Sequence, residues 1–139
     1  AGAANALNGR DANATWTVDN SGLTYVSGQT LTATGFSVLT GGSADDDFTI
    51  ADDITLTIVT DAPTETGADT VFVNQDVTLT LAADLAMGDG NDVLQLASGA
   101  ALTGGDVVGQ DGDDRGILAH LASTCPSRTT FCASSVAIA

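Results

Sequence analysis

The feature that most constrains this chain is a repeat with a nearly fixed step of about 23 residues. Four ten-residue segments align without gaps, and they begin at Gly41, Thr64, Met87 and Gly109. A weaker copy begins at Gly9, further before Gly41 than one step, so one coil carries nine extra residues near Asp19 to Gly28. Self-similarity at this step indicates a stack of equivalent units, each packing on its neighbours.

Within each unit, apolar residues alternate with polar ones. Phe48, Val71 and Leu94 stand at one equivalent position, and Ile54, Val77 and Ala100 stand at another. A third series at the same interval comprises Leu39, Ala62, Leu85 and Val108. A period of two predicts strands with one buried face. A unit this short cannot bury that face alone, so like residues are expected to lie over one another in inward columns.

These patterns predict an all-β chain, folded as a right-handed parallel β-solenoid (β-helix) with about 23 residues per coil. The abundance of Asp, Gly, Thr and Val and the scarcity of Glu and Lys also disfavour helices. The alternative fold is an antiparallel β-sandwich, which offers no reason for a fixed spacing of like residues. We expect the solenoid to occupy residues 1–114, with a longer first coil around residues 9–40.

The sequence changes character at residue 115. All 18 acidic residues precede this point, whereas two of the three arginines, both cysteines and the single histidine follow it. Residues 115–139 are therefore expected to form either a cap that shields the end of the solenoid or a tail foreign to the repeat. Cys125 and Cys132 could close a small disulfide loop, but two thiols alone leave their redox state open.

The charge is strongly acidic, with a formal net charge of −15 and no lysine. Nucleic acids and anionic membranes bind clustered Lys and Arg, so neither is an expected partner. No stretch is apolar enough to insert in a membrane. The Asp-rich composition without lysine favours a protein that is secreted or held at the cell surface. The expected partners are neighbouring repeats of a larger chain, other copies through self-association, or a cell-surface or carbohydrate ligand.

Aspartate recurs at the sixth position of the aligned segments, as Asp46, Asp69, Asp92 and Asp114. In a solenoid these carboxylates would stack about 4.8 Å apart. Each neighbouring pair of charges would cost roughly 1 kcal/mol in water, and about 3 to 4 kcal/mol at an effective dielectric constant of about 20. Either backbone N–H groups of the turns and bulk salt compensate this charge, or a bound cation does.

The turn from Gly88 to Gln95 resembles the nonapeptide of RTX proteins, Gly-Gly-x-Gly-x-Asp-x-apolar-x, with Met87 in the first place. Gly41 to Thr49 matches it apart from Ala44 in the fourth place. In that family the turn carbonyls and the Asp bind Ca²⁺ between coils. The resemblance implies Ca²⁺ as a candidate cofactor, with these candidate ligands: Asp46, Asp69, Asp92 and Asp114, assisted by Asp89, Asn91 and Asp111. RTX motifs follow one another directly, whereas one motif occurs per coil here, so at most one side of the solenoid would hold Ca²⁺.

Residues 8–114 are also similar to the repeat regions of large secreted adhesins and filamentous-haemagglutinin-like β-helix proteins, as in Trp16-Thr17-Val18 and Asp47-Phe48-Thr49-Ile50. This resemblance implies a structural or adhesive module of a secreted or cell-surface bacterial protein, without catalytic residues. The first alternative is a ligand-binding solenoid, for ice or carbohydrate. An outward threonine face could order water and resembles ice-binding solenoids in its Thr-x-Thr pattern; it would be formed by Thr55, Thr57, Thr78, Thr80 and Thr103.

A third alternative is a carbohydrate-active β-helix enzyme. Its carboxylates would come from the run Asp45 to Asp47, or from Asp52 and Asp53. A single glutamate and few aromatic residues disfavour this reading, and His120 has no recognisable catalytic partner. The sequence therefore favours a protein that is not an enzyme.

Overall fold

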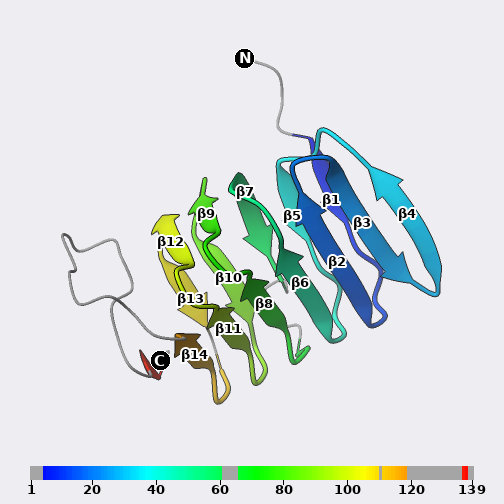
Figure 1. Cartoon of the computed structure of the whole chain (residues 1–139). Coiled ribbons are helices and arrows are strands. Elements are labelled where there is room, and N and C mark those ends of the chain that lie inside the picture. The colour runs from blue at the N-terminus through cyan, green and yellow to red at the C-terminus, as the bar shows by residue number, and fades with distance from the viewer. Residues whose placement is uncertain (1–4, 61–65, 110, 119–135, 138–139) are drawn as a thin grey trace.

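The computed structural model describes residues 5–60, 66–109, 111–118 and 136–137. Every regular element in these ranges is a β-strand, and the ranges contain no helix. In the same ranges, no helix meets the length and hydropathy that a membrane crossing requires. The strands form two sheets that face each other, as rows running from the N-terminal to the C-terminal end (Figure 1).

The larger sheet has eight strands in the order β15-β14-β11-β8-β6-β2-β3-β4. Its strands are β2 (Ala14–Asp19), β3 (Gly22–Ser27), β4 (Gln29–Ala33), β6 (Asp46–Ile50), β8 (Thr70–Val73), β11 (Val93–Leu96), β14 (Arg115–Leu118) and β15 (Val136–Ala137). From β2 to β14 all neighbours pair in parallel. Parallel stacking of strands one repeat apart defines a β-solenoid and excludes the antiparallel sandwich.

The opposite sheet has seven strands and also pairs in parallel throughout. Its strands are β1 (Ala6–Asn8), β5 (Val38–Thr40), β7 (Ile54–Val59), β9 (Thr78–Leu81), β10 (Leu85–Gly88), β12 (Ala101–Gly104) and β13 (Val107–Gly109). Strand β7 has different partners along its length: its first half pairs with β9, and its second half pairs with β5. Each regular coil thus contributes strands to both walls of one elongated core.

The predicted column of Phe48, Val71 and Leu94 is confirmed. The three residues are register partners on β6, β8 and β11, and all are buried. Trp16 continues the column on β2 and stacks on Phe48, with ring centroids 5.0 Å apart. Burying a side chain of this kind contributes about 1.5–3 kcal/mol, and here the burial comes from neighbouring coils.

The predicted column of Ile54, Val77 and Ala100 is wrong at its first member. Ile54 pairs with Leu79 instead of Val77, whereas Val77 and Ala100 keep the regular step. Measured between register partners, the stretch from Val73 to Leu79 is two residues longer than the equivalent stretch from Ile50 to Ile54. Asp76, whose φ is 57°, lies in that longer stretch.

The third predicted column is also corrected. Leu39 lies beside Ile58, and Leu85 lies beside Val107, while Val108 is 43% exposed. Because β7 runs straight where β9 and β10 are separated by a corner, Val59 pairs with Ala86, further along the chain than one regular step. The stretch between Val59 and Asp69 is correspondingly longer and restores that step. Ala62 lies outside the described residues.

The nine extra residues of the first coil form an antiparallel excursion. Strands β2, β3 and β4 make a meander that extends the larger sheet beyond the first coil. Gly22 and Gly28 have positive φ values of 146° and 71° at its two turns. The N-terminal end of this sheet therefore finishes on β4 rather than on a parallel strand.

At the other end, Arg115–Leu118 still forms a strand in register with β11, although the sequence pattern changes at residue 115. Val136–Ala137 pairs antiparallel to it as β15. Residues 119–135, which include His120, Cys125 and Cys132, lie outside the described residues. Whether residues 115–139 form a cap or a foreign tail therefore stays open.

Candidate functional site

The repeated aspartates form a ladder inside the protein. Each stands at the corner where a glycine-containing turn enters a strand of the larger sheet, at the start of β6 or directly before β8, β11 and β14. Their exposed fractions are 0% for the first three and 4% for the last; the residues are Asp46, Asp69, Asp92 and Asp114. We call this set the inner ladder. Buried carboxylates need compensating donors, because water is excluded from them.

The inner ladder is joined from coil to coil by hydrogen bonds between side chain and backbone. The backbone N–H of Asp46 donates to Oδ1 of Asp69 at 2.7 Å. The N–H of Asp69 donates to Oδ1 of Asp92 at 2.8 Å, and that of Asp92 to Oδ1 of Asp114 at 3.1 Å. Each carboxylate therefore binds the coil before its own. Hydrogen bonds to a charged acceptor are stronger than neutral ones, so the ladder ties neighbouring coils together.

Asp46 ends the ladder differently. Its Oδ2 accepts the N–H of Gly42 at 2.7 Å, and its Oδ1 accepts the indole N–H of Trp16 at 3.0 Å. Burial is the main reason that the pKa of Asp46 is raised; the bonds from Gly42 and Trp16 lower it in part, and the charges of Asp47 and Asp45 raise it again. The folded protein therefore holds a proton on this carboxyl more readily than the unfolded chain does.

A column of small residues brings the turns close enough for this ladder. A Cβ on Gly90 would lie 1.8 Å from the carbonyl oxygen of Gly67, and one on Gly112 would lie 1.5 Å from that of Gly90. A Cβ on Gly67 would lie 2.8 Å from the carbonyl oxygen of Ala44. Three of the four positions thus require glycine. Ala44, the departure from the RTX pattern, stands in the first regular coil.

Several side chains nearer the surface accept an N–H from the following coil, whereas the inner ladder accepts N–H groups from the preceding coil. The N–H of Asp111 donates to Oδ1 of Asp89 at 3.2 Å, and the N–H of Asp113 donates to Oδ1 of Asn91 at 2.9 Å. Asp45, Asp53 and Asp84 likewise accept an N–H from the following coil. Sequence reasoning missed this role of Asp53 and Asp84. The signal for Asp84 is present, since Asp106 follows it at the same interval at which Asp111 follows Asp89.

The candidate Ca²⁺ ligands thus divide between the interior and the surface. Asp46, Asp69, Asp92 and Asp114 are buried, and each accepts a backbone or indole N–H, whereas Asn91 and Asp111 are exposed. Among the described residues, no group of three or more His, Cys, Asp or Glu side chains is arranged to hold a metal ion. Calcium binding by the seven candidate ligands stays a prediction from the resemblance.

The threonine face contains one aligned column. Thr55, Thr80 and Thr103 are register partners on β7, β9 and β12, and Oγ1 of Thr80 lies 3.1 Å from Oγ1 of Thr103. Thr57 instead pairs with Val38 on β5, and Thr78 pairs with Ala101. The shift of two residues at the β8–β9 corner therefore separates the threonines that a regular two-column array would bring together.

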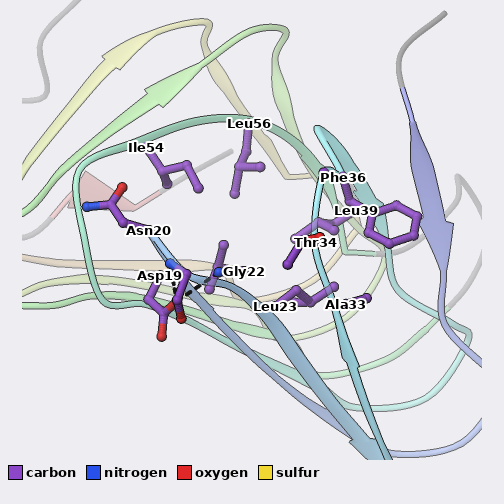
Figure 2. Close-up of a pocket in the computed structure, with 13 residues that line it drawn as sticks. Asp19, Asn20, Gly22, Leu23, Ala33, Thr34, Phe36, Leu39, Ile54 and Leu56 are labelled. Atoms are coloured by element: carbon purple, nitrogen blue, oxygen red, sulfur yellow. Dashed lines mark hydrogen bonds between the residues drawn. The ribbon is translucent and has the colours of Figure 1, made fainter.

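A pocket of about 190 Å³ opens at the N-terminal end of the core. Figure 2 shows Ile54 and Leu56 facing Leu23 across it, with Phe36 at one side and Asn20 at the other. Ile54–Leu56 pairs with β9 on one side. On its other side, in the described ranges, the first coil supplies the meander instead of a parallel strand, and the pocket lies in this place. Sequence reasoning did not predict it.

The pocket has an apolar interior and a polar rim. On the rim, Oδ1 of Asp19 accepts the N–H groups of Ser21 and Gly22 and the hydroxyl of Ser21. The hydroxyl of Ser21 is the main reason that the pKa of Asp19 is lowered. Asp19 therefore stabilises its own turn. A general acid needs a raised pKa, whereas the pKa of Asp19, the acidic residue that lines this pocket, is lowered.

The fold and the ladder define a class of protein, an acidic parallel β-solenoid with buried inter-coil carboxylates. Comparison with protein-family models, with curated proteins and with solved structures finds no match to this chain.

Proposed function

We propose that this chain is a structural and adhesive segment of a larger secreted repeat protein. In this role it is a stiff acidic rod that spaces or presents binding surfaces outside the bacterial cell. The observation that carries the proposal is the inner ladder. Four buried carboxylates, one per coil, serve to bind one coil to the next.

A ladder of this kind suits a load-bearing role. Parallel strands already join the coils through their backbones, and the carboxylates add a charge-assisted bond at the same corner of each regular coil. A hydrogen bond to a charged group contributes about 1.5–3 kcal/mol net, so separating one coil from the next requires that much additional free energy. The other acidic side chains in the described ranges are exposed or half-buried and give the surface a negative charge, which favours cations over nucleic acid or anionic membrane as partners.

The proposal predicts that the ladder, rather than surface carboxylates, sets the resistance of the chain to unfolding. Asp69→Ala removes the acceptor of the buried N–H of Asp46, and Asp84→Ala removes the acceptor of the exposed N–H of Asp106. We expect Asp69→Ala to lower the unfolding force in single-molecule pulling, with Asp84→Ala close to wild type. Equal forces for Asp69→Ala and wild type would contradict a load-bearing ladder.

The second candidate is a ligand-binding solenoid, and the end pocket favours it. At about 190 Å³ the pocket is smaller than the usual 300–1,000 Å³ of small-molecule sites, so it would take a compact, largely apolar group. Binding of the purified chain to small apolar compounds and to a panel of glycans separates the two candidates. Saturable binding that Leu56→Trp abolishes would support the ligand site. A spacer is expected to bind no glycan in this pocket.

The third candidate, a carbohydrate-active enzyme, is separated by turnover on a panel of polysaccharides. Asp45 and Asp47 are exposed, whereas Asp46 between them is buried and accepts the N–H of Gly42 and the indole N–H of Trp16. The alternation of the strand thus points neighbouring carboxylates to opposite faces. Release of reducing ends by the wild-type chain would overturn the structural proposal.

A further inference from the structure

Strand β4 (Gln29–Ala33) leaves one edge of the larger sheet open. It pairs with β3 on one side, and no other described strand pairs with it. Figure 1 shows it as the outermost strand at the N-terminal end of the array. Its first four residues are exposed, and Leu31 at its centre is 43% exposed. An open edge presents backbone N–H and C=O groups that can pair with another strand.

This edge lacks the features by which proteins usually prevent such pairing. Charged side chains, proline and β-bulges are the common devices. Strand β4 has no charge and no proline, and its register with β3 is regular over all five pairs. By contrast, the opposite sheet begins at the three-residue β1, which Arg10 and Asp11 soon follow.

The distribution of charge points to the partner. Residues 20–44 contain no Asp, Glu, Lys or Arg, although the chain as a whole carries a net charge of −15. Two copies of so acidic a chain repel each other over most of their surface. Strand β4 lies within this uncharged segment, so two copies can approach there with the least repulsion.

We propose that β4 is a self-association edge, where two copies of this chain pair antiparallel through β4 about a twofold axis at Leu31. In this register Leu31 faces Leu31 of the second copy, and Gln29 faces its Ala33. Leu31 is the register partner of the buried Tyr25 on β3, so it projects on the side of the sheet that carries the core. The second copy would cover this apolar side chain. The proposal goes beyond the structural role and does not depend on it.

The contact is small, so the dimer is expected to depend on concentration. One pair of five-residue strands buries much less than the roughly 1200–2000 Å² of a stable interface. We therefore expect sedimentation velocity to show a reversible shift from the mass of one chain to twice that mass as concentration rises. A monomer throughout the concentration series would overturn the proposal.

Two lysine substitutions locate the contact. Leu31→Lys places a charge at the centre of the edge and should abolish the shift to the dimer. Val108→Lys is the matched control, because Val108 has the same exposure, 43%, and lies on β13 of the other sheet. It should leave the dimer unchanged. A dimer that survives Leu31→Lys, or that Val108→Lys also abolishes, would contradict pairing through β4.

Cysteine cross-linking tests the register. Residues directly opposite on antiparallel strands have Cβ atoms about 4.5–5.5 Å apart, close enough for disulfide formation after small adjustments. Leu31→Cys should therefore form a covalent dimer on mild oxidation, beyond any formed by the wild-type chain with its own Cys125 and Cys132. A mixture of Gln29→Cys and Ala33→Cys should cross-link better than either alone. Val26→Cys, on β3 and 40% exposed, should not exceed wild type. Equal cross-linking by Val26→Cys would overturn the register.

Discussion

The indole Nε1 of Trp16 donates a hydrogen bond to Oδ1 of Asp46 at 3.0 Å, across 30 residues of sequence. Trp16 is fully buried, and its ring lies 4.4 Å from that of Tyr25 and 5.0 Å from that of Phe48, measured between centroids. The bond joins the longer first coil to the regular coils. The N-terminal end of the inner ladder is thus fixed by an aromatic donor instead of a further aspartate turn.

Asp46→Asn should destabilise the protein although it removes a buried charge. Both oxygens of Asp46 accept an N–H, and an asparagine amide has only one oxygen, so its NH₂ group would face a donor. A buried donor without an acceptor costs about 1–3 kcal/mol. Urea unfolding followed by Trp16 fluorescence measures this loss.

Asp114→Asn is the control for that prediction. Oδ1 of Asp114 accepts the N–H of Asp92, while Oδ2 is buried and has no hydrogen-bond partner in the part of the chain that the structure describes. An amide at this position keeps the first bond, and its NH₂ group replaces an oxygen that already lacks a partner among the described residues, whereas Asp46→Asn also takes the acceptor from a buried N–H. We therefore expect a smaller loss than for Asp46→Asn, and equal losses would contradict the role given to the second oxygen of Asp46.

The raised pKa of Asp46 predicts a pH dependence of stability. Because the folded state holds the proton more tightly, stability due to this group is present below the ordinary value of 3.8 and falls as pH rises towards the folded pKa. The difference in unfolding free energy between wild type and Asp46→Asn should therefore decrease over this interval and level off above it. A difference that grows with pH would contradict the raised pKa.

Gly90→Ala should destabilise the protein more than Gly28→Ala. Both glycines have positive φ, 149° and 71°, so each alanine carries a backbone penalty of about 1–2 kcal/mol. A Cβ at Gly28 meets nothing within 4 Å, whereas one at Gly90 meets the carbonyl oxygen of Gly67 at 1.8 Å. This overlap should add about 1–3 kcal/mol. Thermal melts of the two variants compare the costs, and similar melting temperatures would show that the turns are not closely stacked.

The calcium prediction is tested by melting the protein with Ca²⁺ and with a chelator. A site occupied at a hundredfold excess over its dissociation constant adds about 2.7 kcal/mol to the free energy of unfolding. If Asp89 is a ligand, Asp89→Ala should remove the increase. Asp84→Ala, a carboxylate of the same coil outside the glycine turn, should keep it. An unchanged melting temperature in wild type would contradict calcium binding and leave the solenoid as described.

Much of the fold could be predicted because one signal is strictly periodic. A single repeat step places Phe48, Val71 and Leu94 in one column, and the same step places the four aspartates at one corner. The sequence predicted that either N–H groups or a bound cation compensate these charges, and it did not decide between the two. In the structure each inner carboxylate accepts an N–H, mostly from the preceding coil, because its residue lies at the corner beside that coil's backbone.

The errors arise where equal coil lengths hide unequal corners. Ile54 lies beside Leu79 and Leu39 beside Ile58, although the total step between successive ladder aspartates stays nearly constant. The longer corner before β9 and the straight β7 both increase the register step, and the longer stretch between Val59 and Asp69 restores it. A count of residues between like positions cannot reveal how the length is divided among corners.

The sequence by itself determined that the chain stacks in coils, since a short unit with one apolar face is buried only by its neighbours. It also determined that aspartate and glycine occupy the same corner of each regular coil. Only the tertiary structure decided which way each carboxylate turns, where the meander leaves a pocket, and that β4 ends the sheet with an open edge. These depend on backbone groups that residues far apart in sequence bring together, and the identities of side chains alone do not specify those contacts.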